Sequence, residues 1–337
     1  MTIEPAISCL LPVRDAAETL GAALRSVVRQ TEPGFECLVL DDGSRDDSRA
    51  IANAAASRDP RIRVLQLPRR GLVATLNTGL DAARGRLVAR MDADDLMHSQ
   101  RLACQRAALD EHSDWAATGT HVRLFPRRQI GAGMHAYEAW LNSLRTPADV
   151  LRDAFVECPL AHPTWLLRRE AIPAGGYREE PWPEDYDLFL RLAQVGATLG
   201  VVPRRLLAWR QSPGRLSRSD PRYGTEAFTA CKAAFLAAGF LAEATEYVLW
   251  GYGGTGRALS NALRSHGRRP SHVIELHPGR LGNRIHGAPV VTPDRLREVA
   301  GARPIVVSVS GAAPRAEIRT ALGGMGFRER RDFVVAA

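Results

Sequence analysis

Three aspartates stand within four positions of the segment LVARMDADDL, directly after a run of mostly apolar residues. They are Asp92, Asp94 and Asp95. Carboxylates so close together repel one another unless a positive charge lies among them. A hard divalent cation such as Mg²⁺ or Mn²⁺ prefers oxygen ligands and often bridges a protein carboxylate to substrate phosphates. The segment therefore predicts a cation site or, as the alternative, a solvated turn in which Asp95 caps a following helix.

Further polar residues stand at the ends of two other apolar runs. Asp41 and Asp42 close the run ECLVLDD, and Pro12 and Arg14 lie at the end of AISCLLPV. If these runs are parallel strands, their carboxyl ends meet at one edge of a sheet, which is where such sheets bind ligands. The presence of Asp41 and Asp42 near the three aspartates favours the cation site over the solvated turn.

The segment WPEDYDLFLRL offers a third acidic group. Glu184, Asp185 and Asp187 stand at the start of a predicted amphipathic helix whose inward side carries Leu188 and Leu192. A carboxylate in this position could act as a general base. The alternative is that these acids only favour the positive end of the helix dipole, and we assign Asp187 to that role.

The elements that must position these residues alternate regularly through the first 120 residues. Apolar runs of strand length cover residues 6–13, 36–42, 62–67 and 86–90, and helical periodicity covers residues 17–30, 45–58 and 72–84. Such alternation is typical of an α/β fold in which helices cover both faces of a mostly parallel sheet. We therefore expect the polar residues named above to gather at one rim of that sheet.

The order and spacing of these segments resemble the family 2 glycosyltransferases of the GT-A fold. The likeness includes FECLVLDDGSRDDS, GLVATLNTGLDAARGRLVARMDADD, CPLAHPTWLLRREAI, GGYRE, WPEDYDLFLRLAQVG and AWRQSPGRLS, and covers residues 5–220. It implies an inverting transfer of a sugar from a nucleotide donor, usually with Mg²⁺ or Mn²⁺. The favoured donor is a UDP-sugar. The acceptor would be a glycan, a lipid-linked glycan or a small molecule, in bacterial surface polysaccharide synthesis.

The resemblance also implies roles on the donor side. Asp41 and Asp42 match the acids that such enzymes direct at the base and ribose of the donor. Asp92 and Asp94 match the D-x-D pair, with Asp94 as the direct metal ligand and Asp92 nearer the ribose. The chemistry agrees, because departure of a nucleoside diphosphate builds negative charge that a bound cation stabilises.

On the acceptor side, Asp185 matches the base of the family's E-D motif, with Glu184 beside it. His162 either lines the acceptor site or is a buried structural histidine. Trp182, just before the acidic pair, either stacks on a sugar ring or packs in the fold. The glycines of GGYRE, residues 175–179, allow a close backbone approach to the donor sugar.

Two positions depart from the family pattern. Arg14 stands where many members have an aromatic residue that packs on the base, so the resemblance leaves the identity of the base open. Ser212 stands where many members have a histidine that contacts the metal or pyrophosphate. We expect other groups to complete the site, with Arg210 or Arg215 on the phosphates.

The last part of the chain has a different character. A predicted strand, a glycine turn with Gly251, Gly253 and Gly256, and a helix are followed by Glu275 at the spacing of a ribose-binding acid. We expect a GT-A domain over residues 1–223, a helical connector over 224–245 and a small Rossmann-like α/β domain over 246–337. For the last we favour a structural, oligomerising or regulatory role, with a bound nucleotide or phosphate compound as the alternative.

Two other functions compete with sugar transfer. The first is a dinucleotide-binding oxidoreductase or nucleotide sensor that works through the C-terminal domain, and the second is a non-catalytic scaffold. The acids and the candidate base disfavour the scaffold. Loss of dinucleotide binding on substitution of Gly253 or Glu275 would support the sensor.

The net charge of +8 comes almost wholly from residues 246–337, where 14 arginines are present with 7 acids. The sequence has no basic run with interleaved aromatics, so we expect no nucleic-acid partner. An anionic membrane leaflet suits a basic face equally well. With no signal peptide and no apolar stretch of membrane-spanning length, a cytoplasmic protein is expected. Peripheral membrane contact and a homo-oligomer are left open.

Overall fold

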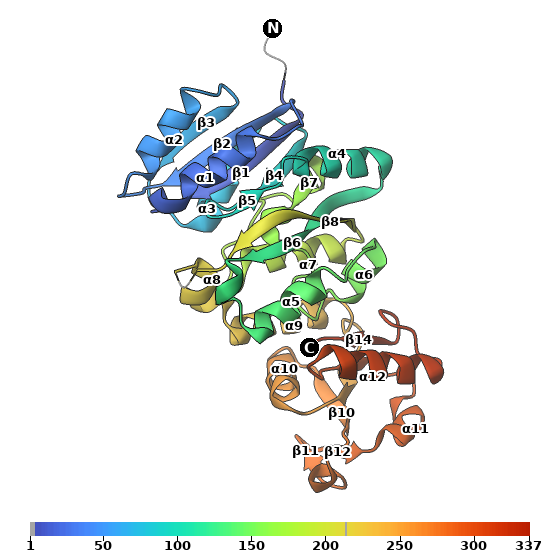
Figure 1. The fold of residues 1–337 in the computed structure, drawn as a ribbon. Coiled ribbons are helices and arrows are strands. Elements are labelled where there is room, and N and C mark those ends of the chain that lie inside the picture. Colours follow the sequence, from blue (N-terminus) through green and yellow to red (C-terminus); the bar gives the residue numbers. More distant parts are fainter. Residues whose placement is uncertain (1–3, 213) are drawn as a thin grey trace. The chain divides into compact units, whose positions relative to one another are not determined.

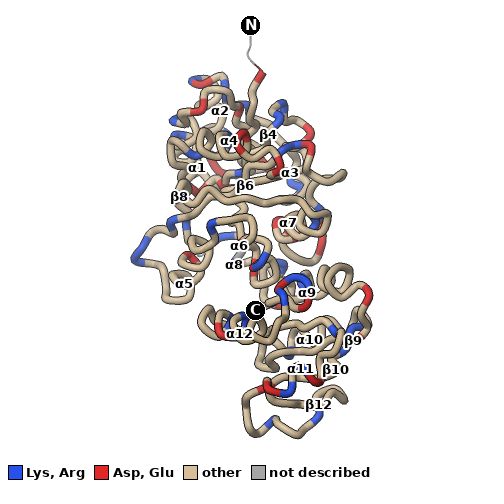
Figure 2. Tube along the Cα trace, turned by 90° about the vertical axis from the view of Figure 1, so that its right-hand side faces the viewer, with Lys and Arg blue, Asp and Glu red and all other residues tan. Residues whose placement is uncertain are grey.

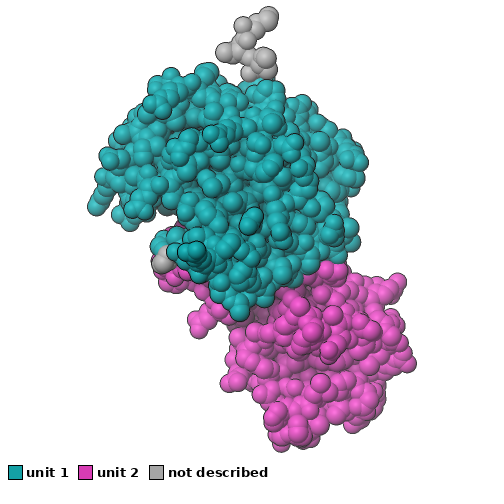
Figure 3. Space-filling model, viewed as in Figure 1, with its two compact units in different colours: residues 1–150, 159–180, 187–215 teal, residues 151–158, 181–186, 216–337 magenta. Residues whose placement is uncertain are grey.

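The computed structural model describes residues 4–212 and 214–337, which form two compact units (Figure 3). Unit 1 comprises the chain up to residue 150 together with residues 159–180 and 187–215. Unit 2 comprises residues 151–158, 181–186 and 216–337. The chain therefore enters unit 2 three times. The domain boundaries at residues 223 and 245 stay a prediction.

Unit 1 is built around an eight-stranded sheet in the order β3-β2-β1-β4-β7-β6-β8-β5 (Figure 1). The strands are β1 (Ile7–Val13), β2 (Phe35–Asp42), β3 (Ile62–Leu67), β4 (Leu87–Arg90), β5 (Leu96–Met97), β6 (Trp115–Phe125), β7 (Leu166–Arg168) and β8 (Thr198–Arg210). The helices are α1 (Ala17–Val28), α2 (Ser48–Ala56), α3 (Leu72–Ala82), α4 (Arg101–Glu111) and α5 (Ala132–Leu141). Helices α6 (Pro147–Arg152) and α7 (Glu184–Gln194) each contain residues of both units.

Different helices cover the two faces of the sheet around β1. Cys9 and Leu11 belong to the same buried cluster as the apolar side of α1, which includes Leu20. Leu10 lies on the opposite face, where a Cβ at Gly79 of α3 would come within 3.1 Å of it. Side chains of a strand alternate between the faces, so a continuous apolar run predicts a strand buried on both sides. That prediction is confirmed for β1.

The direction of the strands changes halfway across the sheet. Strands β3, β2, β1 and β4 are parallel neighbours, as the alternation of strand and helix predicts. Beyond β4 the sheet is mixed, because β7 is antiparallel to both its neighbours and β5 is antiparallel to β8. The expectation of a mostly parallel sheet is therefore wrong for this half. Strands β7 and β5 have three and two residues, which is too short for periodicity to reveal.

Unit 2 contains a six-stranded sheet in the order β11-β12-β10-β9-β13-β14. The strands are β9 (Glu246–Trp250), β10 (Arg269–Ile274), β11 (Arg284–Ile285), β12 (Ala288–Val291), β13 (Ile305–Val307) and β14 (Phe333–Val335). The helices are α8 (Leu216–Ser219), α9 (Thr225–Ala238), α10 (Gly254–Ser265), α11 (Leu296–Ala300) and α12 (Ala312–Gly324). All pairs are parallel except the β11–β12 hairpin, which the sequence analysis missed together with α11.

The glycine turn after β9 has a steric reason. Gly251 has a φ of +95°, a conformation that favours glycine. A Cβ at Gly256 would lie 2.1 Å from the carbonyl oxygen of Gly251, so only glycine lets α10 start so close to the strand. At Gly253 an added Cβ would meet no atom within 4 Å. Two of the three glycines are thus explained by the tight turn between strand and helix.

The upstream segments of unit 2 pack on its C-terminal part. Tyr186 is fully buried, its hydroxyl donates to the carbonyl of Ala154 at 2.8 Å, and its ring lies 5.5 Å from that of Phe228. Arg319 of α12 forms an ion pair of 2.7 Å with Asp153. Residues 151–158 and 181–186 are therefore held by helices far along the chain.

Basic and acidic residues are interspersed along both units (Figure 2). The arginine excess of residues 246–337 is spread over several helices and loops of unit 2, rather than gathered in one run of sequence. Among the described residues, no helix is both long enough and apolar enough to cross a bilayer.

Candidate functional site

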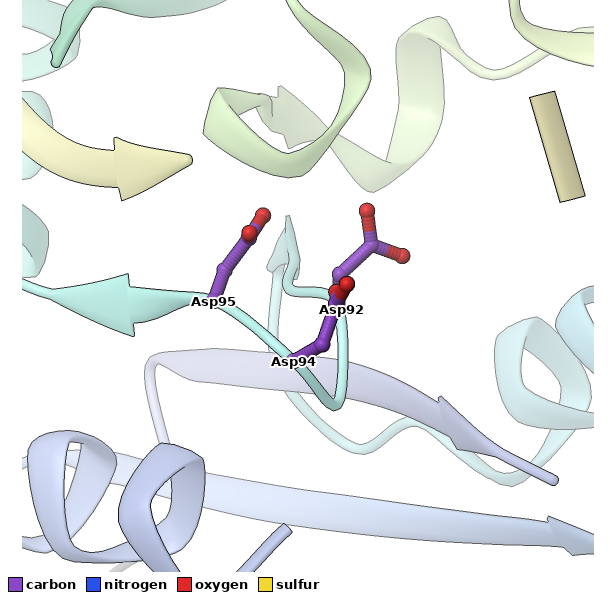
Figure 4. Close-up of side chains that lie close together, drawn as sticks. All are labelled: Asp92, Asp94 and Asp95. Atoms are coloured by element: carbon purple, nitrogen blue, oxygen red, sulfur yellow. The ribbon is translucent and has the colours of Figure 1, made fainter. Parts of the chain in front are cut away.

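The three aspartates of the DADD segment form one cluster in the loop between β4 and β5. Each of Asp92, Asp94 and Asp95 offers a carboxylate oxygen, and these oxygens all lie within 4.8 Å of one another (Figure 4). The loop turns back on itself through a hydrogen bond from the Asp95 N–H to the Asp92 carbonyl. The clustering that the sequence predicts is therefore present.

Asp95 is the most buried member of the cluster, with no exposed surface. One carboxylate oxygen accepts from the backbone N–H of Arg210 at 2.7 Å, whereas Oδ2 has no hydrogen-bond partner among the described residues. Strand β5 follows directly and α4 begins only at Arg101, so the alternative that Asp95 caps a helix is wrong. A buried oxygen without a partner is costly, and this one fits a cation ligand.

Two arginines offset part of the negative charge. Arg90, at the end of β4, forms an ion pair with Asp92, and Arg215 lies 3.3 Å from the other oxygen of the same carboxylate. Burial alone would raise the pKa of Asp92, but these two guanidinium groups hold it below its usual value. The sequence analysis missed Arg90. The available signal was a charged residue in an otherwise apolar strand.

The other two aspartates behave differently. Burial, together with the charge of Asp92, raises the pKa of Asp94, and the same two causes raise the pKa of Asp95 well above its ordinary value. Each of these carboxylates therefore gains from added positive charge. A divalent cation among them would lower both pKa values, because it stabilises the ionised forms.

The arginines expected near the phosphates do approach the acidic loop. The Nε of Arg210 donates to the backbone carbonyl of Asp94 at 2.7 Å, and the guanidinium stacks on the Phe125 ring at 4.5 Å. Arg215 donates to the carbonyl of Arg210 and lies over the Trp209 ring at 5.1 Å. Stacking fixes both side chains beside the cluster.

Asp41 and Asp42, at the end of β2, organise the neighbouring loops. Asp41 accepts from the Ser44 N–H at 2.9 Å and from Arg49 at 3.1 Å. Burial would raise the pKa of Asp41, but hydrogen bonds from Ser44 and Arg49 bring it below the ordinary value. Asp42 accepts from the N–H of Arg70 at 2.7 Å. Their contact with a donor stays a prediction.

Pro12 and Arg14 differ in their surroundings. Pro12 is half-buried in β1, where it pairs with Leu40 of β2. Arg14 lies beyond the strand with 39% of its side chain exposed, and its Nε is 3.9 Å from Asp15. An exposed guanidinium at the rim can reach a ligand with little rearrangement.

The E-D pair opens helix α7, and both residues belong to unit 2. Glu184 is only 4% exposed and accepts a 2.6 Å hydrogen bond from the Tyr223 hydroxyl. Burial and the charges of Glu184 and Asp185 raise the pKa of Tyr223, which keeps it a donor. Asp185 is half-buried and accepts from the N–H of Tyr186 at 2.7 Å. Of the two carboxylates, Asp185 is the more accessible.

Asp187 does more than favour the helix dipole. Its side chain is fully buried and forms ion pairs with Arg178 and with Arg191, the latter at 2.7 Å. Arg191 also donates to the carbonyl of Gly176, so the group ties α7 to the GGYRE loop. Both the glycine loop and the helix are thus fixed by one carboxylate.

Replacing Asp187 with alanine should lower the free energy of unfolding by about 3 kcal/mol, because Arg191, whose side chain is only 14% exposed, loses its carboxylate partner, as does the more exposed Arg178. Urea unfolding at neutral pH measures the change. Asp110→Ala, whose side chain is 51% exposed, is the control and should change stability by less than about 0.5 kcal/mol. An equal effect of the two substitutions would contradict this role.

His162 has the contacts of a structural histidine. It is 5% exposed, its Nε2 lies 2.8 Å from the Tyr177 hydroxyl, and its ring meets the Trp165 ring edge-on. Burial, and then the charge of Arg90, lowers its pKa well below the ordinary value, so the ring is neutral. These contacts favour the structural alternative. Trp182 is half-buried, and its contact with a sugar stays a prediction.

In unit 2, Glu275 already has partners within the chain. Its carboxylate pairs with Arg280 at 2.6 Å and accepts from the backbone N–H of Leu276 at 3.0 Å. Arg280 also donates to the carbonyl of Tyr252. Glu275 thus closes the loop after β10, and its predicted contact with a ribose would require some of these partners to be exchanged.

The α/β fold with an acidic loop at the sheet edge is that of a transferase domain, and comparison with known proteins identifies its family. The family model for glycosyl transferase family 2 matches residues 8–175. EpsE of Bacillus subtilis, which is named as a glycosyltransferase, is 30% identical over 203 residues, covering 58% of this chain and 69% of EpsE. The chain belongs to glycosyl transferase family 2 and is a glycosyltransferase.

A second relative is the amylovoran biosynthesis glycosyltransferase AmsE of Erwinia amylovora. It is 28% identical over 199 residues, which cover 58% of this chain and 72% of AmsE. A further relative is an uncharacterized glycosyltransferase of Rickettsia conorii, and the chain matches only 34% of its length. These relatives thus match about three fifths of this chain but very different shares of their own length.

Solved structures share the fold at low sequence identity. TarS of S. aureus, residues 1–349 in complex with UDP-GlcNAc, has a TM-score of 0.58 at 18% identity and covers 77% of this chain and 72% of that one. The mannosyltransferase PcManGT of Pyrobaculum calidifontis, in complex with GDP-Man and Mn²⁺, has a TM-score of 0.50 at 17% identity and covers 97% and 82%. These similarities confirm the GT-A fold of the N-terminal part.

Proposed function

We propose that the chain is a metal-dependent, inverting glycosyltransferase of bacterial surface polysaccharide synthesis. It moves a sugar from a nucleotide diphosphate, favoured to be a UDP-sugar, to a hydroxyl of a glycan, lipid-linked or small-molecule acceptor. The observation that carries the proposal is the cluster of Asp92, Asp94 and Asp95 at the carboxyl edge of the parallel strands. AmsE, which is named for amylovoran biosynthesis, supports a polysaccharide acceptor. TarS, whose complex contains UDP-GlcNAc, supports uracil as the base of the donor.

The acidic cluster fits a Mg²⁺ or Mn²⁺ ion. Asp94 would be the principal ligand, with Asp95 or Asp92 beside it, and the unpartnered Oδ2 of buried Asp95 is the observation that supports this fit. When bound, the cation supplies positive charge against the developing negative charge of the leaving diphosphate. PcManGT, whose complex contains Mn²⁺, supports the choice of metal.

Asp185 is the proposed base. It would accept the proton of the acceptor hydroxyl as that oxygen attacks the anomeric carbon, which inverts the configuration in one displacement. Glu184 beside it is held by Tyr223, and Tyr186 donates its N–H to Asp185. These bonds fix the direction of the carboxylate before an acceptor arrives. Arg210 or Arg215 would share the diphosphate charge with the cation.

For residues 246–337 we propose a Rossmann-like module. The parallel strands β12, β10, β9, β13 and β14 and the tight glycine turn after β9 support it. The partners that Glu275 already has argue against a dinucleotide as the ligand. The oxidoreductase alternative is therefore the weaker one.

Thermal unfolding with nucleotides tests the donor site. We expect one nucleoside diphosphate, UDP first, to raise the melting temperature by several degrees only when Mn²⁺ is present, since a ligand at 100 times its Kd adds about 2.7 kcal/mol. GDP and ADP serve as base controls, and Asp94→Ala should abolish the shift. A shift that needs neither Mn²⁺ nor Asp94 would reject the proposed donor site.

A further inference from the structure

Unit 2 contains a cavity of about 430 Å³, whose lining includes Tyr223, the residue that bonds Glu184. It lies at the carboxyl ends of three strands, because Thr255 follows β9, Ser308 and Ser310 follow β13, and Ala336 follows β14. Pockets that bind small molecules measure about 300–1,000 Å³, so the cavity has room for a small metabolite. All its lining residues belong to unit 2.

The topology of the sheet places this cavity at a switch point. From β9 the chain runs through α10 to β10 on one side, and later returns through α11 to β13 on the other side of β9. Parallel sheets bind ligands where successive connections leave in opposite directions, beyond the carboxyl ends of the strands. Thr255 and Ser310 stand on the two sides of this point, with hydroxyl oxygens 3.3 Å apart.

Two cations line the cavity. Lys232, the only lysine of the chain, donates to the carbonyls of Val156 and Ala336, which uses two of its three N–H donors. Arg315, in the first turn of α12, donates to the carbonyl of Ala337 at 3.3 Å. Neither cation lies within ion-pair distance of a carboxylate of a described Asp or Glu. Glu157 also lines the cavity, so the charged side chains of the lining are two cations and one acid.

Burial acts on both cations. It lowers the pKa of Lys232 to about 8 in spite of the charge of Glu157, and it lowers the pKa of Arg315 in spite of the charge of Asp153. Lys232 is desolvated and, within the described part of the chain, bonds only the backbone oxygens of Val156 and Ala336, so it is stabilised by an anion that enters beside it. The charge of the lining therefore points to an anionic ligand.

Hydrogen-bond donors complete the lining. Ser308 is 2% exposed, and its Oγ has no partner among the described residues. Helices α10 and α12 both start at this edge, and their N-caps, Gly253 and Gly311, supply no side-chain hydrogen bond to the free N–H groups of the first turn. The positive ends of the two helices favour an anion in the same place.

We propose that unit 2 holds a second binding site, in this cavity, for a small phosphorylated metabolite. A phosphate monoester offers several oxygens on one centre, which matches donors that converge from Lys232, Arg315 and the hydroxyls of the β9 and β13 loops. A carboxylate offers only two oxygens in one plane. The site goes beyond sugar transfer and does not depend on the roles of the acidic cluster.

Calorimetric titration of the full chain in EDTA tests the site, with inorganic phosphate, glucose 1-phosphate and AMP as probes and acetate as the carboxylate control. We expect at least one phosphate probe to bind more tightly than acetate. Lys232→Met and Arg315→Ala should each weaken that probe at least about tenfold, as loss of a charge-assisted hydrogen bond does. Asp94→Ala, in the acidic cluster, and Arg331→Ala, on an exposed loop, should leave its Kd unchanged.

A second readout places the probe. Reductive methylation with ¹³C-formaldehyde labels the single lysine side chain, and its methyl resonance should shift on addition of the phosphate probe. If Lys232→Met does not fold, Ser308→Ala replaces it, because that variant removes only an unpaired hydroxyl. The proposal is overturned if no phosphate probe binds, if acetate binds equally well, if Asp94→Ala removes binding, or if neither cavity substitution weakens it.

Discussion

Replacing Asp94 with alanine is expected to lower kcat/KM for sugar transfer by about a thousandfold, the effect of losing one electrostatic contact to a charge that develops in the transition state. The protein should fold normally. Burial, and then the charge of nearby Asp92, raises the pKa of Asp94, so removal of this carboxylate relieves the cluster rather than weakening it. The unfolding free energy at pH 7 should be unchanged or higher.

Initial rates with a saturating acceptor and a varied donor measure the effect of Asp94→Ala, and urea unfolding verifies the fold. Asp110→Ala on the exposed side of α4 is the control for the loss of a carboxylate, and should keep wild-type kinetics. Wild-type kcat/KM in Asp94→Ala would remove this residue from the donor site.

Asp185→Asn is expected to lower kcat roughly 100- to 10,000-fold, the usual contribution of a general base. Donor binding should be unaffected, because the lost group acts on the acceptor proton. The asparagine Oδ1 can still accept the hydrogen bond from the N–H of Tyr186. The start of α7 should therefore keep its structure. The substitution therefore separates chemistry from folding.

Single-turnover transfer with preloaded donor measures the chemical step in Asp185→Asn, and the metal-dependent thermal shift measures donor affinity. Glu184→Gln is the matched control. It should lose less activity, since Glu184 is buried and bonded to Tyr223 rather than open to an acceptor. A larger loss of kcat in Glu184→Gln than in Asp185→Asn would move the base to Glu184.

The parallel half of the sheet could be predicted because its signals are local. In β1 and β2 every position but one is buried, which gives a continuous apolar run, and each strand is followed by a helix with one apolar side. The mixed half could not be predicted in this way. Strand β7 has three residues, and its partners β4 and β6 are set by packing far along the chain.

The acids of the candidate site were predictable for the same reason, since Asp41 lies at the end of one buried strand and Asp92 comes two positions after the end of another. The charges that balance them were not. Arg215 is brought to Asp92 across 123 positions of sequence, and Arg210 reaches the acidic loop from the end of β8. Which arginine meets which acid is decided by tertiary structure. The cavity of unit 2 was likewise beyond prediction, because its lining combines Val156 with residues near Ala337.

Unit 2 is built from three separate stretches of the chain, and this limits how chimeric enzymes can be made. The segment 181–186, which carries the proposed base, packs on Phe228 through Tyr186. The segment 151–158 is held by the ion pair between Asp153 and Arg319. If only the C-terminal region were exchanged between related glycosyltransferases, it would have to pack against segments 151–158 and 181–186 of another protein. Functional chimeras should therefore require all three stretches to be transplanted as one set.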